Sequence, residues 1–209
     1  MLYITNGDAF NAHLQKEKGV IAIPFREAMM AGEVPDTPIF SNSFIRIRAS
    51  HHGVRETEYR TKTVAPLSKV GSNSLTLYFG RDTFCQMNLL TLLAYLEEMG
   101  SKAEIALNII DDETFSVLKE NIPVALGGYR DIYKTVLIKH EMPTHFGVID
   151  ERSVSLFFDY LSAEGFLAQT VRKHSEESEI ALITRLLTVS ADYGLSDTMA
   201  KDLIKKYKV

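Results

Sequence analysis

"SLTLYFGRDTFCQMNLLTLLAYLEEMG", residues 74–100, is the stretch that decides the fold class of this chain. Residues 74–79 read as a buried strand, because they are apolar or hydroxylated and carry no charge. Residues 82–99 then predict a helix, which Gly100 ends. A largely apolar run at residues 103–110 reads as the next strand. A strand, a helix and a strand with tight turns between them are typical of a βαβ unit in a parallel sheet.

The beginning of the chain repeats this pattern. Residues 2–5 and 20–25 read as short apolar strands, and residues 9–18 between them predict a helix that Gly19 ends. Parallel strands are covered on both faces and read as continuous apolar runs, which fits all four predicted strands. The segment 44–62 stays open between a helix with a basic face and a pair of irregular segments.

Helices dominate the pattern of the second half of the chain. We expect them at residues 112–122, 129–141, 151–174, 178–191 and 195–207, with the last two joined at Asp192-Tyr193-Gly194. The predicted fold class is therefore α/β with two parts. These are an N-terminal domain with a parallel (βαβ) sheet, residues 1–112, and a helical C-terminal region, residues 113–209.

The composition limits the class of protein. The 209 residues carry a formal net charge of −4, which gives no global electrostatic case for binding nucleic acid or an anionic membrane. The single cysteine, Cys85, excludes an internal disulfide and fits a reducing compartment. The N-terminus has no signal-peptide pattern, and the longest apolar stretch is far shorter than the roughly 20 residues that cross a bilayer. We therefore expect a soluble cytoplasmic protein with no membrane partner.

Polar side chains follow the first and third predicted strands, at the point where each strand ends. Ligands of open α/β sheets bind beyond the carboxyl ends of the strands, so these turns are the candidate site. Gln86 lies one helical turn after Asp82 and shares its face. The candidate acid/base residues are Asp8 and Asp82, and the candidate ligand-binding residues are Asn6, Gly7, Arg26, Arg81, Gln86 and Asn88.

The alternative is that these residues only stabilise the backbone of the turns and helix ends. Asp8 and Asp82 both stand where a helix begins, and aspartate at this position commonly accepts hydrogen bonds from the first backbone N–H groups. Cys85 reads as a small buried thiol. The adjacent His51 and His52 point apart in any regular structure, which favours a surface role, although one of them becomes a candidate general base if the segment 44–62 covers the strand ends.

The residue types limit the chemistry of this site. Carboxylate and amide groups suit a small polar ligand, and Arg26 and Arg81 would neutralise a small anionic molecule. If the protein is an enzyme, hydrolysis or group transfer is the expected reaction class. The chain has no phosphate-binding glycine loop, no dinucleotide fingerprint and no zinc-ligand spacing, so the cofactor stays unknown and no metal site is predicted.

A second class of function uses the C-terminal helices. Lys201, Lys205, Lys206 and Lys208 lie late in the last predicted helix, where they would contact phosphates in a DNA-binding regulator or simply complement the helix dipole. The start of that helix lacks base-reading side chains, so DNA is an open but not a favoured partner. A homodimer seam along residues 88–96 is a third alternative, and a protein partner of the C-terminal helices also stays open.

Three short segments together resemble an uncharacterised bacterial domain-of-unknown-function family. They are "LYITNGDAF", "IPFREAMMAGEV" and "FGRDTFCQMNLLTLLAYL", and they span about the first 110 residues. Members share an Asn-Gly-Asp turn, an Arg after the second strand and a "D-x-x-x-Q-x-N-L" helix, whereas this chain reads "MMAGEV" where members often have "His-Glu-Gly-Pro". The resemblance implies no established activity, although some relatives are labelled transcriptional regulators. It matches the family pattern at Asn6, Gly7, Asp8, Arg26, Asp82, Gln86 and Asn88.

Overall fold

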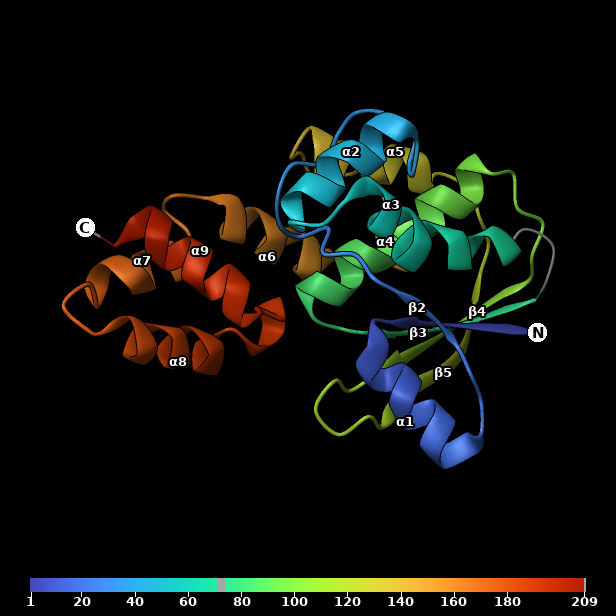
Figure 1. Cartoon of the computed structure of the whole chain (residues 1–209), viewed down its shortest axis with the longest axis horizontal. Coiled ribbons are helices and arrows are strands. Elements are labelled where there is room, and N and C mark those ends of the chain that lie inside the picture. Colours follow the sequence, from blue (N-terminus) through green and yellow to red (C-terminus); the bar gives the residue numbers. More distant parts are fainter. Residues whose placement is uncertain (71–73, 209) are drawn as a thin grey trace.

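The computed structural model of the chain describes residues 1–70 and 74–208 and contains a five-stranded sheet. The strands lie in the order β2-β1-β3-β4-β5, with the first four parallel and β5 antiparallel to β4. Their bounds are β1 Leu2–Asn6, β2 Ile23–Phe25, β3 Leu75–Gly80, β4 Ile105–Ile110 and β5 Val117–Val124. Together with the helices that surround the sheet, this arrangement confirms the predicted α/β class (Figure 1).

The central position of β3 explains why its sequence is apolar throughout. It pairs with β1 on one side and β4 on the other, in a register that aligns Leu77 with Ile4 and Leu107. Every residue of β3 is buried, because helices cover both faces of the sheet. A strand covered on both faces needs no polar alternation, which is the pattern the sequence has.

The helices of the N-terminal half lie on the two faces of this sheet. Figure 1 shows α1 on one face and α2 to α5 on the other. Helix α4 lies inside the larger core, and its Leu89, Leu92 and Leu93 are all fully buried. These leucines therefore form the interior of the single chain rather than an exposed dimer seam. The helix bounds are α1 Asp8–Lys18, α2 Asn42–His51, α3 Glu56–Tyr59 and α4 Thr83–Glu98, followed after the sheet by α5 Tyr129–Tyr133.

The segment 44–62, left open from the sequence, is helical, and a buried ion pair anchors it. It contains most of α2, all of α3 and the start of a π-helical turn, η1, Arg60–Val64, which a 3₁₀ turn, η2, Ala65–Lys69, continues. Arg48 on α2 is fully buried and donates to the Glu27 carboxylate at 2.7 Å. Its other N–H groups donate to the carbonyls of Ala28, Ala31 and Glu33. The Arg48 guanidinium thus holds the connector that follows β2 against α2.

The prediction of a helix at residues 112–122 is wrong, because this segment contains the edge strand β5. Phe115, Leu118 and Ile122 have helical spacing, which explains the error. In the structure the segment is a strand that pairs irregularly with β4. Ile110 faces Val117 and Ile109 faces Lys119, so Leu118 is an extra residue on β5. Such a bulge interrupts the strict alternation by which a strand is recognised in a sequence.

The single helix predicted at residues 151–174 is also wrong, since the chain breaks into α6, Glu151–Leu161, and α7, Phe166–Lys173. The Asp159 carboxylate accepts a hydrogen bond from the Phe166 backbone N–H at 3.0 Å and so starts the second helix. Gly165 approaches α6 so closely that a Cβ atom there would lie 1.9 Å from the Asp159 carbonyl oxygen. A local cap and a close contact, rather than periodicity, end the first helix.

The remaining helical predictions agree with the structure. Of residues 129–141, residues 129–138 form α5 and a following π-helical turn, η3, Lys134–Ile138. The last two helices are α8, Glu179–Val189, and α9, Asp197–Tyr207, joined through a 3₁₀ turn, η4, Ala191–Tyr193. None of the described helices is both long and apolar enough to cross a membrane.

The C-terminal helices lie at the carboxyl end of the parallel strands. Figure 1 shows α7, α8 and α9 grouped at one end of the molecule, with α6 leading back to the sheet domain. The turn η4 also reaches that domain, because the Thr83 hydroxyl donates to the Asp192 carbonyl at 3.1 Å. The edge of the sheet at which ligands are expected is therefore faced by residues from the last third of the chain.

Candidate functional site

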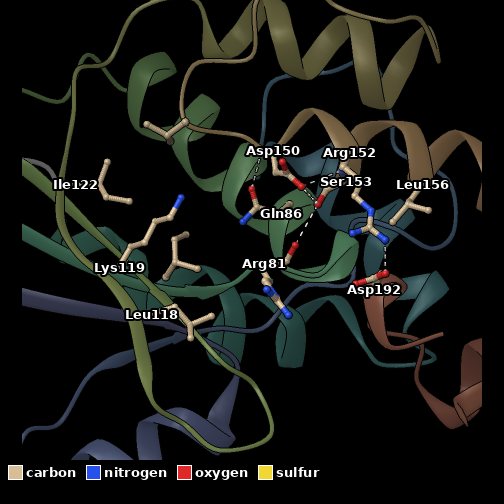
Figure 2. Close-up of a pocket in the computed structure, with 12 residues that line it drawn as sticks. Arg81, Gln86, Leu118, Lys119, Ile122, Asp150, Arg152, Ser153, Leu156 and Asp192 are labelled. Atoms are coloured by element: carbon tan, nitrogen blue, oxygen red, sulfur yellow. Dashed lines mark hydrogen bonds and ion pairs between the residues drawn. The ribbon is translucent and has the colours of Figure 1, made fainter. Parts of the chain in front are cut away.

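A cavity of about 580 Å³ lies beyond the carboxyl ends of β3 and β4. Its walls come from the turn between β3 and α4, from β4 and β5, from the start of α6 and from η4 (Figure 2). Its volume lies within the range of about 300–1,000 Å³ that is typical of pockets for small organic ligands. The chain builds this cavity from segments that are far apart in the sequence.

Three cationic side chains line the cavity, and one of them is in an ion pair. Arg152 forms an ion pair with Asp192 at 2.5 Å across the cavity wall. Arg81 and Lys119 make no side-chain hydrogen bond and no salt bridge with any residue in the part of the chain that the structure describes. The charge of Arg81 contributes only a minor part to the lowered pKa of Asp111. The cavity lining thus carries three cations against two carboxylates, those of Asp150 and Asp192, and this excess of positive charge favours an anionic occupant.

The bulge of β5 explains why neighbouring residues line one cavity. In a regular strand, Leu118 and Lys119 would point to opposite faces. The extra residue at Leu118 re-aims the side chains at this place, and both border the cavity together with Ile122. A second irregularity follows at Asn121, which has a left-handed φ of 52° and donates its backbone N–H to Asn108 Oδ1 at 2.9 Å.

Two hydrogen bonds hold the start of α6 against the turn between β3 and α4. The Gln86 side chain donates to the Gly80 carbonyl at 2.8 Å and accepts from the Asp150 backbone N–H at 3.1 Å. The Ser153 hydroxyl donates to the Arg81 carbonyl at 3.1 Å. Gln86 is almost fully buried, so it shapes the wall of the cavity and keeps Arg81 in place.

A smaller cavity of about 200 Å³ adjoins the first, with Arg81 and Asp192 lining both. Asp82 and Asp112 line it from the ends of β3 and β4. Asp82 caps α4 by accepting a hydrogen bond from the Cys85 backbone N–H at 2.7 Å, which is the capping role that the sequence offered as the alternative. Asp112 is an exposed residue, but its carboxyl packs so tightly on Gly80 that a Cβ atom there would lie 1.8 Å from it.

The carboxyl group of Asp112 holds its proton up to about neutral pH. Burial of its carboxyl, then the hydrogen bond with Asp82 and the charge of that group, raises the pKa of Asp112 to about 7. A second carboxyl group this close disfavours the ionised form of Asp112. Such a carboxyl group can act as a proton donor or acceptor near physiological pH.

Cys85 lies beside this pair, but its thiol is not activated. Its Sγ is 3.6 Å from Asp112 Oδ1 and accepts a hydrogen bond from the Asn6 amide at 2.8 Å. Burial and the nearby Asp82 and Asp112 raise its pKa well above the ordinary value, so the thiol stays protonated. Ligand atoms of Asp82, Cys85 and Asp112 lie within 4.8 Å of one another, which is close enough for the three side chains to share a metal ion. The sequence analysis predicted no such grouping.

Asn6 and Asn88 are brought together, but in a structural link. The Asn88 amide donates to Asn6 Oδ1 at 2.8 Å and to the Glu27 carbonyl at 2.6 Å, and its Oδ1 accepts from the Met29 N–H at 3.0 Å. Asn88 is fully buried, and neither asparagine lines either cavity. The carboxyl ends of β1 and β3 thus lie side by side, as expected. The two asparagine amides link β1, α4 and the connector that follows β2.

Asp8 and Arg26 neutralise each other away from the two cavities. Arg26 donates to both Asp8 oxygens, at 2.9 and 2.7 Å, and also to the Lys62 carbonyl at 2.8 Å. The hydrogen bond from Arg26 lowers the pKa of Asp8. Gly7 allows the turn before α1, with a left-handed φ of 76°. Of the predicted residues, Arg81 and Gln86 line the larger cavity, and Asp82 lines the smaller one beside Arg81.

The two histidines serve the packing of α2. His52 Nε2 lies 3.2 Å from a carboxylate oxygen of the buried Glu27. His51 packs against Gly32, where a Cβ atom would lie 2.3 Å from its ring. Neither histidine lines a cavity at the carboxyl ends of the strands.

Two of the C-terminal lysines are engaged inside their own helical group. Lys208 donates to the Glu177 carbonyl at 2.7 Å, and the Lys206 ammonium lies 4.9 Å from the centre of the Tyr207 ring. These contacts give no support to a phosphate-binding face, and DNA binding stays an untested prediction.

Sequence reasoning missed most of the cavity wall. Asp112 could have been identified as a site residue from the sequence, since it follows β4 just as Asp82 follows β3. Lys119 and Arg152 had none, because the first lies on a strand that has helical spacing and the second on a helix far along the chain. Their meeting with Arg81 is a result of tertiary packing.

Comparison with known proteins adds no assignment to this geometry. No protein-family model, no curated protein and no solved structure matches the chain. The resemblance to a domain-of-unknown-function family therefore stays a prediction, and the site has to be interpreted from its own geometry.

Proposed function

We propose that the protein binds a small polar or anionic ligand in the 580 Å³ cavity at the carboxyl ends of β3 and β4. The observation that carries this proposal is the pair of cations, Arg81 and Lys119, which line one cavity and make no salt bridge with any described residue (Figure 2). Like charges around one cavity repel each other, and an anion bound between them relieves that repulsion.

The neighbouring acid pair supports an extension from binding to proton transfer. Asp82 and Asp112 border a cavity that shares Arg81 with the ligand cavity. A carboxyl group that holds its proton near neutral pH, as that of Asp112 does, suits the acid/base step of a hydrolase or transferase. In this proposal Arg81 and Lys119 bind the ligand, and Asp112 and Asp82 exchange a proton with it.

A thermal-shift screen tests the binding proposal. We expect inorganic phosphate, organic phosphates or carboxylates to raise the Tm of the wild-type protein, and Arg81→Gln or Lys119→Gln to reduce that shift by more than half. Lys102→Gln is the matched control, because Lys102 is exposed and precedes β4 at the opposite end of the strand. An anion-induced shift that survives both cavity substitutions, or the absence of any shift, would contradict the proposal.

A further inference from the structure

The larger cavity has one apolar wall, which the proposed function does not use. Ile109, Leu118 and Ile122 line it from β4 and β5. Leu118 is 46 % exposed, although large apolar side chains on an edge strand are normally covered. Val148 and Leu156 add apolar surface on the side of α6. An apolar surface of this kind that is open to a cavity indicates that the ligand buries apolar atoms there, in addition to being attracted by charge.

The charged groups are concentrated elsewhere on the lining. Figure 2 shows Leu118 and Ile122 on the β5 side, with Arg81, Arg152 and Asp192 on the side of the β3–α4 turn and α6. Lys119 projects from the β5 side towards the space between them. A ligand that fills the cavity therefore meets an apolar surface on β5, with Lys119 beside it, and the guanidinium groups on the side of the β3–α4 turn and α6.

The size of the cavity also argues against an inorganic anion as the natural occupant. About 580 Å³ is far more space than one tetrahedral anion fills, and lies in the range for organic ligands. Arg81 and Lys119 make no salt bridge with the described residues and match a single anionic head group, because Arg152 is already paired with Asp192.

From these observations we infer that the ligand is an amphiphilic organic anion: an apolar body, about the size of one ring, that carries one phosphate or carboxylate group. The apolar body packs on Leu118 and Ile122, and the head group lies between Arg81 and Lys119. This inference rests on the proposed function and narrows it, because sugar phosphates and free phosphate lack the apolar body.

Calorimetric titration with four probes tests the inference: phenyl phosphate, phenylacetate, glucose 6-phosphate and inorganic phosphate. We expect phenyl phosphate to bind about tenfold more tightly than glucose 6-phosphate and inorganic phosphate, which is the gain from burying about 60 Å² of apolar surface. Phenylacetate distinguishes the two sources of the head group: tighter binding than phenyl phosphate assigns a carboxylate, and weaker binding assigns a phosphate.

Leu118→Gln should remove the tenfold preference and leave the affinity for inorganic phosphate unchanged. Leu118 is already exposed, so this substitution spares the core, and Met142→Gln is the matched control because Met142 is 47 % exposed and lies outside the cavity. Equal affinity for phenyl phosphate and glucose 6-phosphate, or a preference that survives Leu118→Gln, overturns the inference while the proposed function stands. Absence of binding by all four probes overturns both.

Discussion

Asp112 is a residue whose protonation depends on tertiary contacts. Its carboxyl group faces Asp82 across a small cavity and packs on Gly80, so the folded protein favours its neutral form. In the unfolded chain the same group ionises near its ordinary pKa of 3.8. A carboxyl that resists ionisation in the native state opposes folding once the pH is high enough to ionise it in the unfolded chain.

The first prediction concerns this pH dependence. Because the folded pKa of Asp112 is raised to about 7, its favourable contribution is complete below about pH 4 and is lost as the pH rises through about 7. Asp112→Asn keeps a neutral group that can donate to Asp82. We expect its Tm to match that of the wild type near pH 4 and to exceed it increasingly up to about pH 8. A Tm difference that does not change with pH would show that Asp112 titrates normally.

Arg48 is a second residue whose role depends on complete burial. Both it and Glu27 have no exposed side-chain surface, and the pair is held at 2.7 Å. Burial disfavours the Glu27 charge, but hydrogen bonding with His52 and the charge of Arg48 outweigh it and lower the Glu27 pKa to about 2. The carboxylate is thus ionised at all ordinary pH values and depends on its cation.

The second prediction is that Arg48→Gln destabilises the protein by about 3–5 kcal/mol, because it leaves the Glu27 charge buried without a cation. Arg46→Gln on the exposed side of the same helix should change the free energy of unfolding by no more than about 0.5 kcal/mol. Urea denaturation of the two variants measures this difference. Similar stabilities for both would mean that Glu27 finds water or a proton instead.

At the scale of elements, the contacts between neighbouring helices decide where each one ends. Helices α6 and α7 would form one continuous amphipathic helix if periodicity alone mattered. The Asp159 carboxylate ends this continuity by capping α7, and the glycine before α7 lets its start approach the end of α6. The break turns the chain from α6, which lines the cavity, into the C-terminal helical group.

The third prediction is argued from this break. A Cβ atom at Gly165 would lie 1.9 Å from the Asp159 carbonyl oxygen, so Gly165→Ala forces backbone to move and should cost about 1–3 kcal/mol. Gly127→Ala is the matched control, because a Cβ atom there has no neighbour within 4 Å. Chemical denaturation compares the two. Equal stabilities would mean that the α6–α7 junction relaxes without cost.

At the scale of the whole molecule, the cavity is formed jointly by the sheet and by segments from the last third of the chain. The sheet provides Arg81 and the bulged β5, whereas the C-terminal part provides Arg152 and Asp192. Hydrogen bonds between Thr83 and Asp192, and between Ser153 and Arg81, hold these walls together. A ligand in the cavity therefore contacts both parts, and its binding energy would stabilise their association.

The sequence by itself determined the parallel sheet and the long buried helix. Continuous apolar runs at β1, β3 and β4 and the apolar sequence of α4 are local patterns, and burial on all sides follows from them. The carboxyl-end rule located Arg81, Asp82 and Gln86 at the cavities, because the meeting of parallel strand ends depends only on sheet topology.

Tertiary structure alone decided which charges stay free for a ligand. Asp8 and Arg26 fit the same sequence pattern as Arg81, yet they neutralise each other, since their distance depends on how β2 lies beside β1. Lys119 reaches the cavity because of a bulge in β5. The apolar residues around this bulge have helical spacing, so the strand is not recognised from the sequence. Pairing and bulges depend on partners distant in the chain, and local periodicity contains no information about those partners.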